Sequence, residues 1–474
     1  MVPRILVFIL CTLLISCLGV NKDKVQEIPL AKPNVIFINV DDLGWKDTGF
    51  MGGEFFETPN IDLLASESMV FPRSYSAAAN CAPSRACLMT GLNTPRHGVY
   101  TVSPSARGNK KSRKLVPIEN TDSLLLKDIT MAEVFKKAGY TTGVFGKWHL
   151  GKDPTEQGFD VNVGGGIRGN PGRDGYFSPY NDLSNLESGP ERENLTDRLT
   201  QESLQFIRDN KDRPFFVYLP FYAVHTPLQA KQELVTKYAG KSNPKKISSV
   251  YAAMVETVDQ NVGKILKSIA ELGLEQNTIL IFTSDNGGIR SISTQEPLRA
   301  GKGSYYEGGI RVPCTIKWPG TNMAGKIIGK PISNLDFFPT FMELLNVDMP
   351  NYRSDGQNLM PLLKGGTMGE RPLFWHFPIY LEAYDPKMDD GRDPMFRTRP
   401  GSVVMQGDWK LHYYYEDNEI ELYNLRDDLG ERNNLNTSNP SKAKELLNLL
   451  KVWLNETGAP IPKVPNPDYD SQKN

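Results

Sequence analysis

Short runs of apolar residues alternate with helical patterns from residue 34 onward. A helix is predicted to begin after Thr130, because Thr130 and Glu133 have the spacing of a capping box. A second helix is predicted over residues 247–272, where apolar side chains recur every three or four positions. The intervening apolar runs are rich in β-branched and aromatic residues, as in strands that are covered on both faces. These runs are residues 35–40, 141–145, 215–219 and 279–283.

This alternation predicts a doubly wound α/β domain, with a mostly parallel sheet and helices on both of its faces. After about residue 370 the pattern changes to short strands joined by turns, followed by a helix over about 443–454. We therefore expect a large domain over residues 34–370 and a smaller α+β subdomain with an antiparallel sheet over 371–474. The strands predicted in the subdomain are residues 402–405, 409–415 and 421–424. A segment rich in Gly, Asn and Pro, residues 160–192, is predicted to be a long loop.

The amino terminus has the pattern of an export signal. Arg4 precedes an apolar stretch, residues 5–15, that as a helix would be roughly 17 Å long, too short to span a bilayer core of about 30 Å. We therefore expect residues 1–16 to be a signal peptide. Residues 14–17 resemble the lipobox of bacterial lipoproteins, which predicts lipidation of Cys17 and a polar tether over residues 17–33. The alternative is an ordinary cleaved signal in which Cys17 is incidental. Either way the predicted location is the cell envelope or periplasm of a bacterium, with membrane contact only through the lipid anchor.

The composition of the chain excludes some classes of protein and makes nucleic acid an unexpected partner. The chain has 474 residues, with 54 Lys and Arg against 55 Asp and Glu. A chain of this size can bury a large core, which excludes a disordered protein and a small disulfide scaffold. The near-zero net charge and the absence of a basic run make nucleic acid an unexpected partner.

Polar residues follow each of the four predicted strands of the large domain. In open α/β sheets, ligands bind beyond the carboxyl ends of the strands, so these residues are expected to converge on one crevice. They are Asp41 and Asp42, Lys147 and His149, His225, and Asp285 and Asn286.

Two of these clusters supply oxygen ligands. Asp41 and Asp42, with Asp285 and Asn286, favour calcium or magnesium over zinc or copper. A pair of this kind alone is more often a solvated turn or a helix cap, but two pairs that each follow a buried strand favour the metal site.

A cysteine in the segment from Cys81 to Gly91 is a further candidate. Pro83 suits the first turn of a helix and Gly91 its end, which places Cys81 near a helix N-terminus, where an anion is favoured. From these residues alone, Cys81 could be a nucleophilic thiolate or a buried apolar side chain.

The same segment resembles the signature of the sulfatase family, a branch of the alkaline phosphatase superfamily. The signature is Cys81-x-Pro-Ser-Arg85 followed by Gly91, and the stretch from Gly139 to Gly151 is similar to the second motif of the family. The similarity extends from about residue 34 to 434. It also includes Asp41-Asp42-x-Gly44-Trp45, Ser284-Asp285-Asn286-Gly287 and Gly301-Lys302.

The resemblance implies a nucleophile made from a cysteine. Cys81 would be oxidised to formylglycine by a formylglycine-generating enzyme or an anaerobic maturase, and would hydrate to a geminal diol. One hydroxyl would attack sulfur, and loss of a proton from the other would expel sulfate.

The remaining roles carry over by position. The resemblance implies Ca2+, rather than Mg2+, bound by Asp41, Asp42, Asp285, Asn286 and the modified Cys81. Arg85 would orient the diol, His149 would act as a base, and His225 would protonate the leaving alcohol. Lys147 and Lys302 would bind the sulfate oxygens.

The expected substrate is a sulfated polysaccharide or oligosaccharide, since stretches near residues 164–180 and 375–378 look like those of bacterial carbohydrate sulfatases that act on galactose or N-acetylgalactosamine. Arg168 and His376 are predicted to contact it, and Arg397 and Arg399 are further candidates for binding an anionic glycan. A histidine with satisfied hydrogen bonds is the alternative for His376.

Two other functions stay open: a phosphomonoester or phosphonate ester hydrolase of the same superfamily, and a non-catalytic protein that binds sulfated glycans.

Overall fold

A seven-stranded sheet forms the centre of the protein, in the order β2-β9-β7-β1-β6-β4-β5. The computed structural model describes residues 32–473, so the predicted signal peptide, Cys17 and nearly all of the tether lie outside the described residues. From β7 to β5 the strands are parallel, and only β9 and β2 run antiparallel to their neighbours. The prediction of a mostly parallel sheet is confirmed. In spatial order the strands are β2 (Met69–Val70), β9 (Cys314–Lys317), β7 (Thr278–Ser284), β1 (Asn34–Val40), β6 (Phe215–Pro220), β4 (Thr141–Phe145) and β5 (Val161–Val163).

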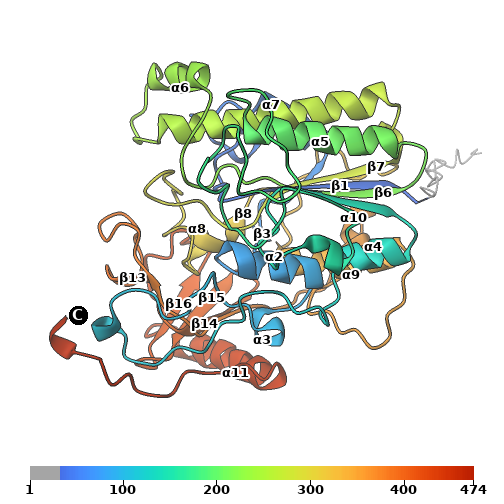
Figure 1. Ribbon diagram of the computed structural model, residues 1–474. Coiled ribbons are helices and arrows are strands. Elements are labelled where there is room, and N and C mark those ends of the chain that lie inside the picture. Colours follow the sequence, from blue (N-terminus) through green and yellow to red (C-terminus); the bar gives the residue numbers. More distant parts are fainter. Residues whose placement is uncertain (1–31, 474) are drawn as a thin grey trace, which may run out of the picture.

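Helices cover both faces of this sheet (Figure 1). On one face lie α1 (Pro59–Ser66), α5 (Leu195–Asp209), α6 (Gln232–Ala239) and α7 (Ser249–Glu271). On the other face lie α2 (Cys81–Thr90), α4 (Met131–Lys137), α9 (Phe337–Leu344) and α10 (Met360–Leu363). Each face has its own apolar core, since alternate strand residues such as Ile36 and Phe37 belong to different buried clusters.

The two predicted helices form where their sequence signals place them. The Thr130 hydroxyl accepts a hydrogen bond from the backbone of Glu133, whose carboxylate accepts from the backbone of Thr130, so the predicted capping box caps α4. The longer helix, α7, is capped by Ser248 and buries the apolar stripe expected for residues 247–272.

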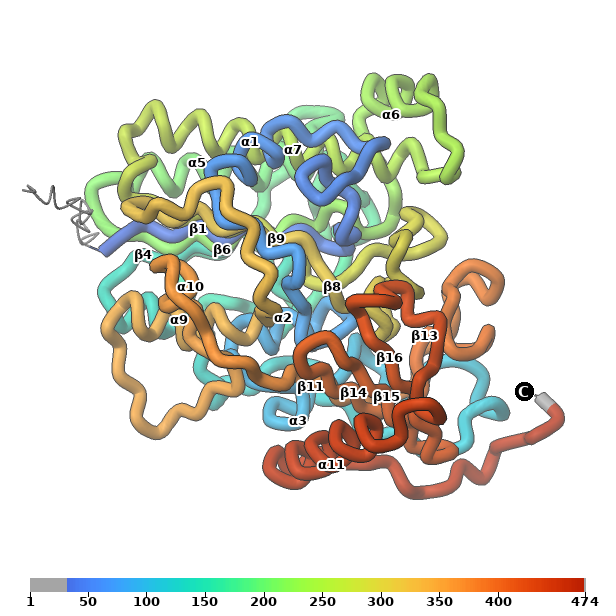
Figure 2. The backbone as a smooth tube through the Cα atoms, turned by 180° about the vertical axis from the view of Figure 1, so that it is seen from behind, coloured from blue at the N-terminus to red at the C-terminus, as the bar shows by residue number. Residues whose placement is uncertain are grey.

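A second, four-stranded antiparallel sheet lies beside the large domain, with one long helix packed on it (Figure 2). Three of its strands and the helix were predicted. The fourth strand, β11, was missed, although it is a largely buried apolar run of the same kind as the strands predicted in the large domain. Its first residue, Leu373, lies close to the expected domain boundary at 370. The elements are β11 (Leu373–Phe377), β14 (Gly401–Gln406), β15 (Trp409–Tyr414), β16 (Ile420–Asn424) and α11 (Pro440–Glu456).

Short elements connect the two parts. A three-stranded sheet joins β10 (Ile332–Ser333), β3 (Ser74–Tyr75) and β8 (Arg311–Val312), and a two-stranded sheet joins β12 (Leu381–Glu382) and β13 (Phe396–Thr398). Two one-turn helices, α3 (Thr94–His97) and α8 (Glu307–Ile310), complete the set. None of the helices described between residues 32 and 473 has both the length and the apolar character needed to cross a membrane.

Strand register brings the predicted polar residues to one edge of the sheet. Val40, the last residue of β1, pairs with Ser284, the last residue of β7, so Asp41 and Asp285 emerge side by side. At the end of β4, Gly146 has a φ of 126°, and a Cβ there would lie 2.1 Å from the carbonyl oxygen of Pro220. Only glycine allows this approach, which ends with the backbone N–H of Lys147 donating to the Pro220 carbonyl.

Candidate active site

Helix α2 delivers Cys81 to the carboxyl edge of the sheet. Cys81 is the first residue of the helix and is 2% exposed. Its thiol lies 3.4 Å from Asp41 Oδ1 and 3.9 Å from Asp42 Oδ1. Gly91 ends the helix in the left-handed conformation, as expected. The signature helix and the end of β1 therefore meet at the sulfur atom.

Three carboxylates lie around this cysteine. Asp41, Asp42 and Asp285 are each buried and offer oxygens that all lie within 4.8 Å of one another. Asn286 donates from Nδ2 to Asp42 Oδ1 over 2.8 Å, whereas its Oδ1 is buried and has no hydrogen-bond partner. Asp42 has a φ of 62°, a left-handed conformation that is uncommon outside glycine and is found at functional sites.

Three cations pair with these carboxylates. Lys147 Nζ lies 2.5 Å from Asp41, and Lys302 Nζ lies 2.7 Å from Asp42. Arg85 binds Asp285 through two nitrogens, at 2.8 and 2.9 Å, and donates to the Lys147 carbonyl. The formal charges of the three acids and three bases cancel.

Two histidines border the cluster. His225 Nε2 lies 3.7 Å from Asp42 Oδ2, and its Nδ1 donates a hydrogen bond over 2.6 Å to the carbonyl of Thr226, which can act only as an acceptor. His149 also has a left-handed φ, of 63°, and its buried Nδ1 has no hydrogen-bond partner. Burial, together with Lys302, lowers the pKa of His225 to about 4. Burial, together with Lys147, places the pKa of His149 well below its usual value. Both rings are therefore neutral in the free protein.

The environment suppresses the thiolate form of Cys81. Burial and the neighbouring Asp41 raise the pKa of the thiol to about 12, which outweighs the favourable position at a helix N-terminus. The unmodified cysteine is consequently a protonated, weakly nucleophilic thiol at neutral pH. Of the two alternatives left open by the sequence, a reactive thiolate is disfavoured.

The donor set fits a hard divalent cation. Burial raises the pKa of Asp41 to about 6, whereas Lys302 and His225 hold the pKa of Asp42 well below its usual value although burial raises it. Asn286 Oδ1 is an unsatisfied acceptor beside these carboxylates, and buried acceptors are normally paired. The three carboxylates and the Asn286 amide offer oxygens, the ligands that Ca2+ and Mg2+ prefer, although Cys81 and His225 also lie close to Asp41.

The residues that fix the loop after β1, which carries Asp41 and Asp42, could not be identified from the sequence. Asp47 accepts hydrogen bonds from the Tyr251 hydroxyl at 2.6 Å, from the Ser293 hydroxyl at 2.6 Å, and from the Gly44 backbone. The Tyr251 hydroxyl also lies 3.3 Å from the carbonyl of Asp42. Their only signal is an acid three residues after Gly44, which is too common to be informative.

The long loop covers His149 and brings Arg168 to the rim of the site. A Cβ on Gly169 would lie 2.4 Å from Cε1 of His149, so the loop backbone rests directly on that ring. The adjacent Arg168 side chain is 49% exposed and lies 3.5 Å from Asp182. It does not join the buried cluster.

His376 lies away from the cluster, in the second subdomain. It is 1% exposed, and its Nε2 lies 3.1 Å from the Pro460 carbonyl while its Nδ1 lies 2.8 Å from the Ser402 hydroxyl. These contacts correct the substrate-binding role expected for His376 and favour the alternative, a structural histidine with satisfied hydrogen bonds.

The three cysteines of the described chain are free and buried. They are Cys81, Cys87 and Cys314. Cys87 Sγ lies 3.4 Å from Nε2 of the buried His97, so this histidine also has a structural environment.

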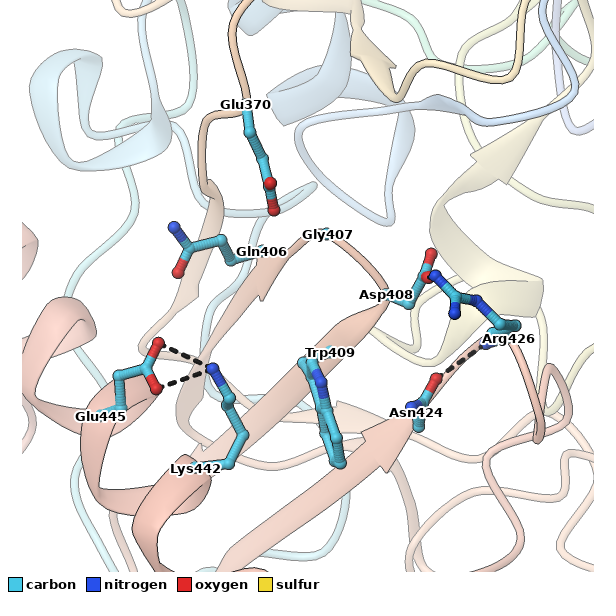
Figure 3. A pocket seen from close by; sticks show the side chains of 9 residues that line it. All are labelled: Glu370, Gln406, Gly407, Asp408, Trp409, Asn424, Arg426, Lys442 and Glu445. Carbon is cyan, nitrogen blue, oxygen red and sulfur yellow. Dashed lines mark hydrogen bonds and ion pairs between the residues drawn. The ribbon is translucent and has the colours of Figure 1, made fainter.

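A surface hollow of about 400 Å3 lies at the turn between β14 and β15, in the second subdomain (Figure 3). Its lining includes none of the predicted site residues. Its charges are largely paired, Asp408 with Arg73 and Arg426, and Glu445 with Lys442.

Comparison with known proteins assigns the family. Residues 33–347 match the model described as Sulfatase, and residues 301–459 match that of the C-terminal region of N-sulphoglucosamine sulphohydrolase. The chain belongs to the sulfatase family.

Three relatives illustrate the range of this sulfatase's similarity. It is 32% identical to a sulfatase of Formosa agariphila over 93% of both chains. It is 35% identical to the N-acetylgalactosamine-6-sulfatase of Mus musculus, over 73% of this chain and 68% of that protein. The crystal structure of Ps i-CgsB in complex with k-i-k-neocarrahexaose has a TM-score of 0.74 and 30% identity, over 89% of this chain and 92% of the other. The protein is accordingly a sulfuric ester hydrolase.

The buried His376 makes a testable contribution to the stability of the sulfatase. Burial lowers its pKa to about 3, whereas in the unfolded chain it titrates near 6.5. Because the folded pKa is depressed, this contribution is complete above about pH 6.5 and is lost as the pH falls towards about 3. Between pH 7 and 4.5 it should amount to about 2 kcal/mol of unfolding free energy.

The variant His376→Gln replaces the two ring nitrogens by an amide, which can still donate and accept hydrogen bonds but cannot titrate. In denaturant unfolding at both pH values, this variant should lose about 2 kcal/mol less than the wild type between pH 7 and 4.5. An equal loss in the two proteins would show that His376 is not buried in the neutral form.

Proposed function

We propose that this sulfatase hydrolyses sulfate esters of a polysaccharide or oligosaccharide, with Cys81 converted to formylglycine as the nucleophile. The observation that carries the proposal is the position of Cys81 Sγ, 3.4 Å from Asp41, in a buried cluster that also contains Lys147, Lys302 and Arg85. Asp41, Asp42, Asp285 and Asn286 would hold Ca2+, whose chemistry there is that of a Lewis acid for the sulfate oxygens. Converted to formylglycine, Cys81 would supply the geminal diol that attacks sulfur.

Positive charge in the cluster supports binding of the sulfate group. Lys147, just after β4, and Lys302, in the loop between β7 and α8, present ammonium groups that are 0% and 3% exposed. In such a water-poor site, charge–charge interactions are stronger than in solvent. We infer that these two lysines bind sulfate oxygens, and that Arg85, fixed by Asp285 and the Lys147 carbonyl, orients residue 81.

Proton transfer is assigned to the two histidines. His149 is neutral and has an unpartnered buried ring nitrogen, so it can accept a proton from the residue 81 diol. His225 has its Nδ1 against a carbonyl and turns Nε2 towards the cluster. An anionic sulfate ester beside that ring favours its protonated form. Nε2 would then donate to the oxygen of the departing sugar, whose alkoxide is a poor leaving group.

A galactose or N-acetylgalactosamine unit is the substrate class that the similarities favour. The mouse relative is named an N-acetylgalactosamine-6-sulfatase, and Ps i-CgsB was solved with k-i-k-neocarrahexaose.

Maturation and export complete the proposal. A formylglycine-generating enzyme or an anaerobic maturase would oxidise Cys81, and the amino-terminal signal with Cys17 would place the enzyme in a bacterial envelope. Mass spectrometry of the peptide containing residue 81 tests the first point, because conversion of a thiol to an aldehyde lowers the mass.

Ester specificity tests the proposed reaction. Sulfate and phosphate release are measured from phenyl sulfate, phenyl phosphate, galactose and N-acetylgalactosamine sulfated at position 4 or 6, and k-i-k-neocarrahexaose. We expect kcat/KM for phenyl sulfate to exceed that for phenyl phosphate by at least about a hundredfold, a difference of about 2.7 kcal/mol. At least one of the saccharides should release sulfate.

Cys81→Ser is the matched control, since it keeps the size of the side chain but cannot form an aldehyde by the same route. It should show no multiple turnover while its unfolding midpoint stays close to that of the wild type.

In the wild type, faster release of phosphate from phenyl phosphate than of sulfate from phenyl sulfate would instead support the phosphoester hydrolase. A chain that binds the saccharides with residue 81 still a thiol, and releases no sulfate, would support the non-catalytic alternative.

His225 is tested by varying the leaving group. His225→Ala should reduce kcat for a sugar sulfate by about 100-fold to 10,000-fold, the usual range for a general acid. The loss should be much smaller for 4-nitrophenyl sulfate, because a nitrophenolate leaves without protonation. Equal losses on the two esters would contradict the assignment of His225 as the acid.

A further inference from the structure

An arginine buried without a carboxylate partner lies next to the proposed sulfate site. Arg397, on β13, is 5% exposed. Its Nε donates to the Glu382 carbonyl at 2.8 Å and its Nη1 to the Lys302 carbonyl at 3.1 Å, while Nη2 is buried with no hydrogen-bond partner. No ion pair joins Arg397 to a carboxylate anywhere between residues 32 and 473. A buried charge of this kind is costly and is rarely retained for stability alone.

The guanidinium of Arg397 is packed between a backbone and an aromatic ring. A Cβ on Gly303, the residue after Lys302, would lie 2.7 Å from Nη1, so one side of the group rests on the chain that carries Lys302. Its Cζ lies 3.4 Å from the centroid of the Tyr384 ring, a stacked cation–π contact. Arg397 therefore connects Tyr384 to Lys302.

Tyr384 is held in place yet open to solvent. Its backbone N–H donates to Asp389 Oδ2 at 2.6 Å, which fixes the chain at this point. One face of its ring lies on Arg397, but the residue is 46% exposed. Arg397 contacts both this ring and, over 3.1 Å, the carbonyl of Lys302, so Tyr384 is linked through one side chain to the residue whose ammonium group faces the site.

We propose that the open face of Tyr384, held in position by Arg397, is the surface on which a pyranose ring of the anionic glycan substrate stacks while its sulfate occupies the site beside Lys302. This inference rests on the proposed function, whose substrate it makes more specific. An aromatic face suits the apolar C–H face of a sugar ring, and the cation beneath it favours a sugar that carries negative groups. Tyr384 would be a substrate-binding residue and Arg397 a positioning residue.

The test separates binding of the sugar from binding of the sulfate. Steady-state kinetics use the saccharide of the panel above that the wild type cleaves with the highest kcat/KM. Inorganic sulfate, which has no ring to stack, serves as a competitive inhibitor. Tyr384→Ala should raise KM for the saccharide by about fivefold to tenfold, the size of one stacking contact, with kcat and the inhibition constant of sulfate changed by less than about twofold.

Four further variants make the result specific. Tyr384→Phe keeps the ring and should restore a KM close to that of the wild type. Arg397→Met removes the charge under the ring and should raise KM in the same way. In the double variant Tyr384→Ala and Arg397→Met, KM should rise no further than in the more impaired single variant, because both changes remove one contact. Met388→Ala, an exposed side chain on the same segment, is the matched control and should leave KM unchanged.

The outcomes are distinguishable. An unchanged KM in Tyr384→Ala, or an inhibition constant of sulfate that rises as much as KM, would overturn the stacking subsite and leave the proposed function intact. A wild-type enzyme that releases sulfate from phenyl sulfate but from none of the saccharides would overturn the glycan assignment, and the subsite with it. Comparable unfolding midpoints in all variants exclude a loss of fold.

Discussion

Six charged side chains share one buried site at the carboxyl edge of the central sheet, and the rest of the structure is arranged around them. Asp41, Asp42 and Asp285 are matched by Arg85, Lys147 and Lys302. Removing any one of them would leave a buried charge unpaired, which typically costs about 3–5 kcal/mol. Evolution of a protein for stability alone would replace such a cluster with apolar residues. Its retention is explained by the chemistry that a concentrated, ordered set of charges makes available.

Each part of the fold supplies one piece of this site. Parallel pairing of β1 with β7 sets Asp41 beside Asp285, and the glycine after β4 lets Lys147 approach the end of β6. Helix α2 contributes both the candidate nucleophile at its first residue and Arg85 one turn later. The second subdomain adds Arg397 and Tyr384 next to Lys302, so that recognition of the sugar and binding of the sulfate would come from different parts of the chain.

Local sequence signals predicted much of this arrangement, and long-range packing determined the rest. The strands, the capping box before α4 and the limits of α2 follow from apolar runs, Thr130 with Glu133, and Pro83 with Gly91. The convergence of four strand ends follows from the rule for parallel sheets. Strand β11 was missed although it is, like the predicted strands of the central sheet, a largely buried apolar run.

The surroundings of His376 show what local sequence patterns could not predict. Its partners, Ser402, Tyr415 and Pro460, are 26, 39 and 84 residues away in the chain, so no local pattern could identify them. Tyr384 and Asp47 were likewise invisible, because an isolated tyrosine or aspartate has no signature until the residues that hold it are known.

The central claim is that the carboxylates and Asn286 gather around one divalent cation beside residue 81. An anomalous difference map from crystals of the full enzyme grown with Ca2+ tests it most directly. The account predicts a single strong peak in contact with Asp41, Asp42, Asp285 and Asn286, next to an oxidised residue 81. No peak there, or an ion bound elsewhere with the lysines still paired to the two aspartates, would contradict it.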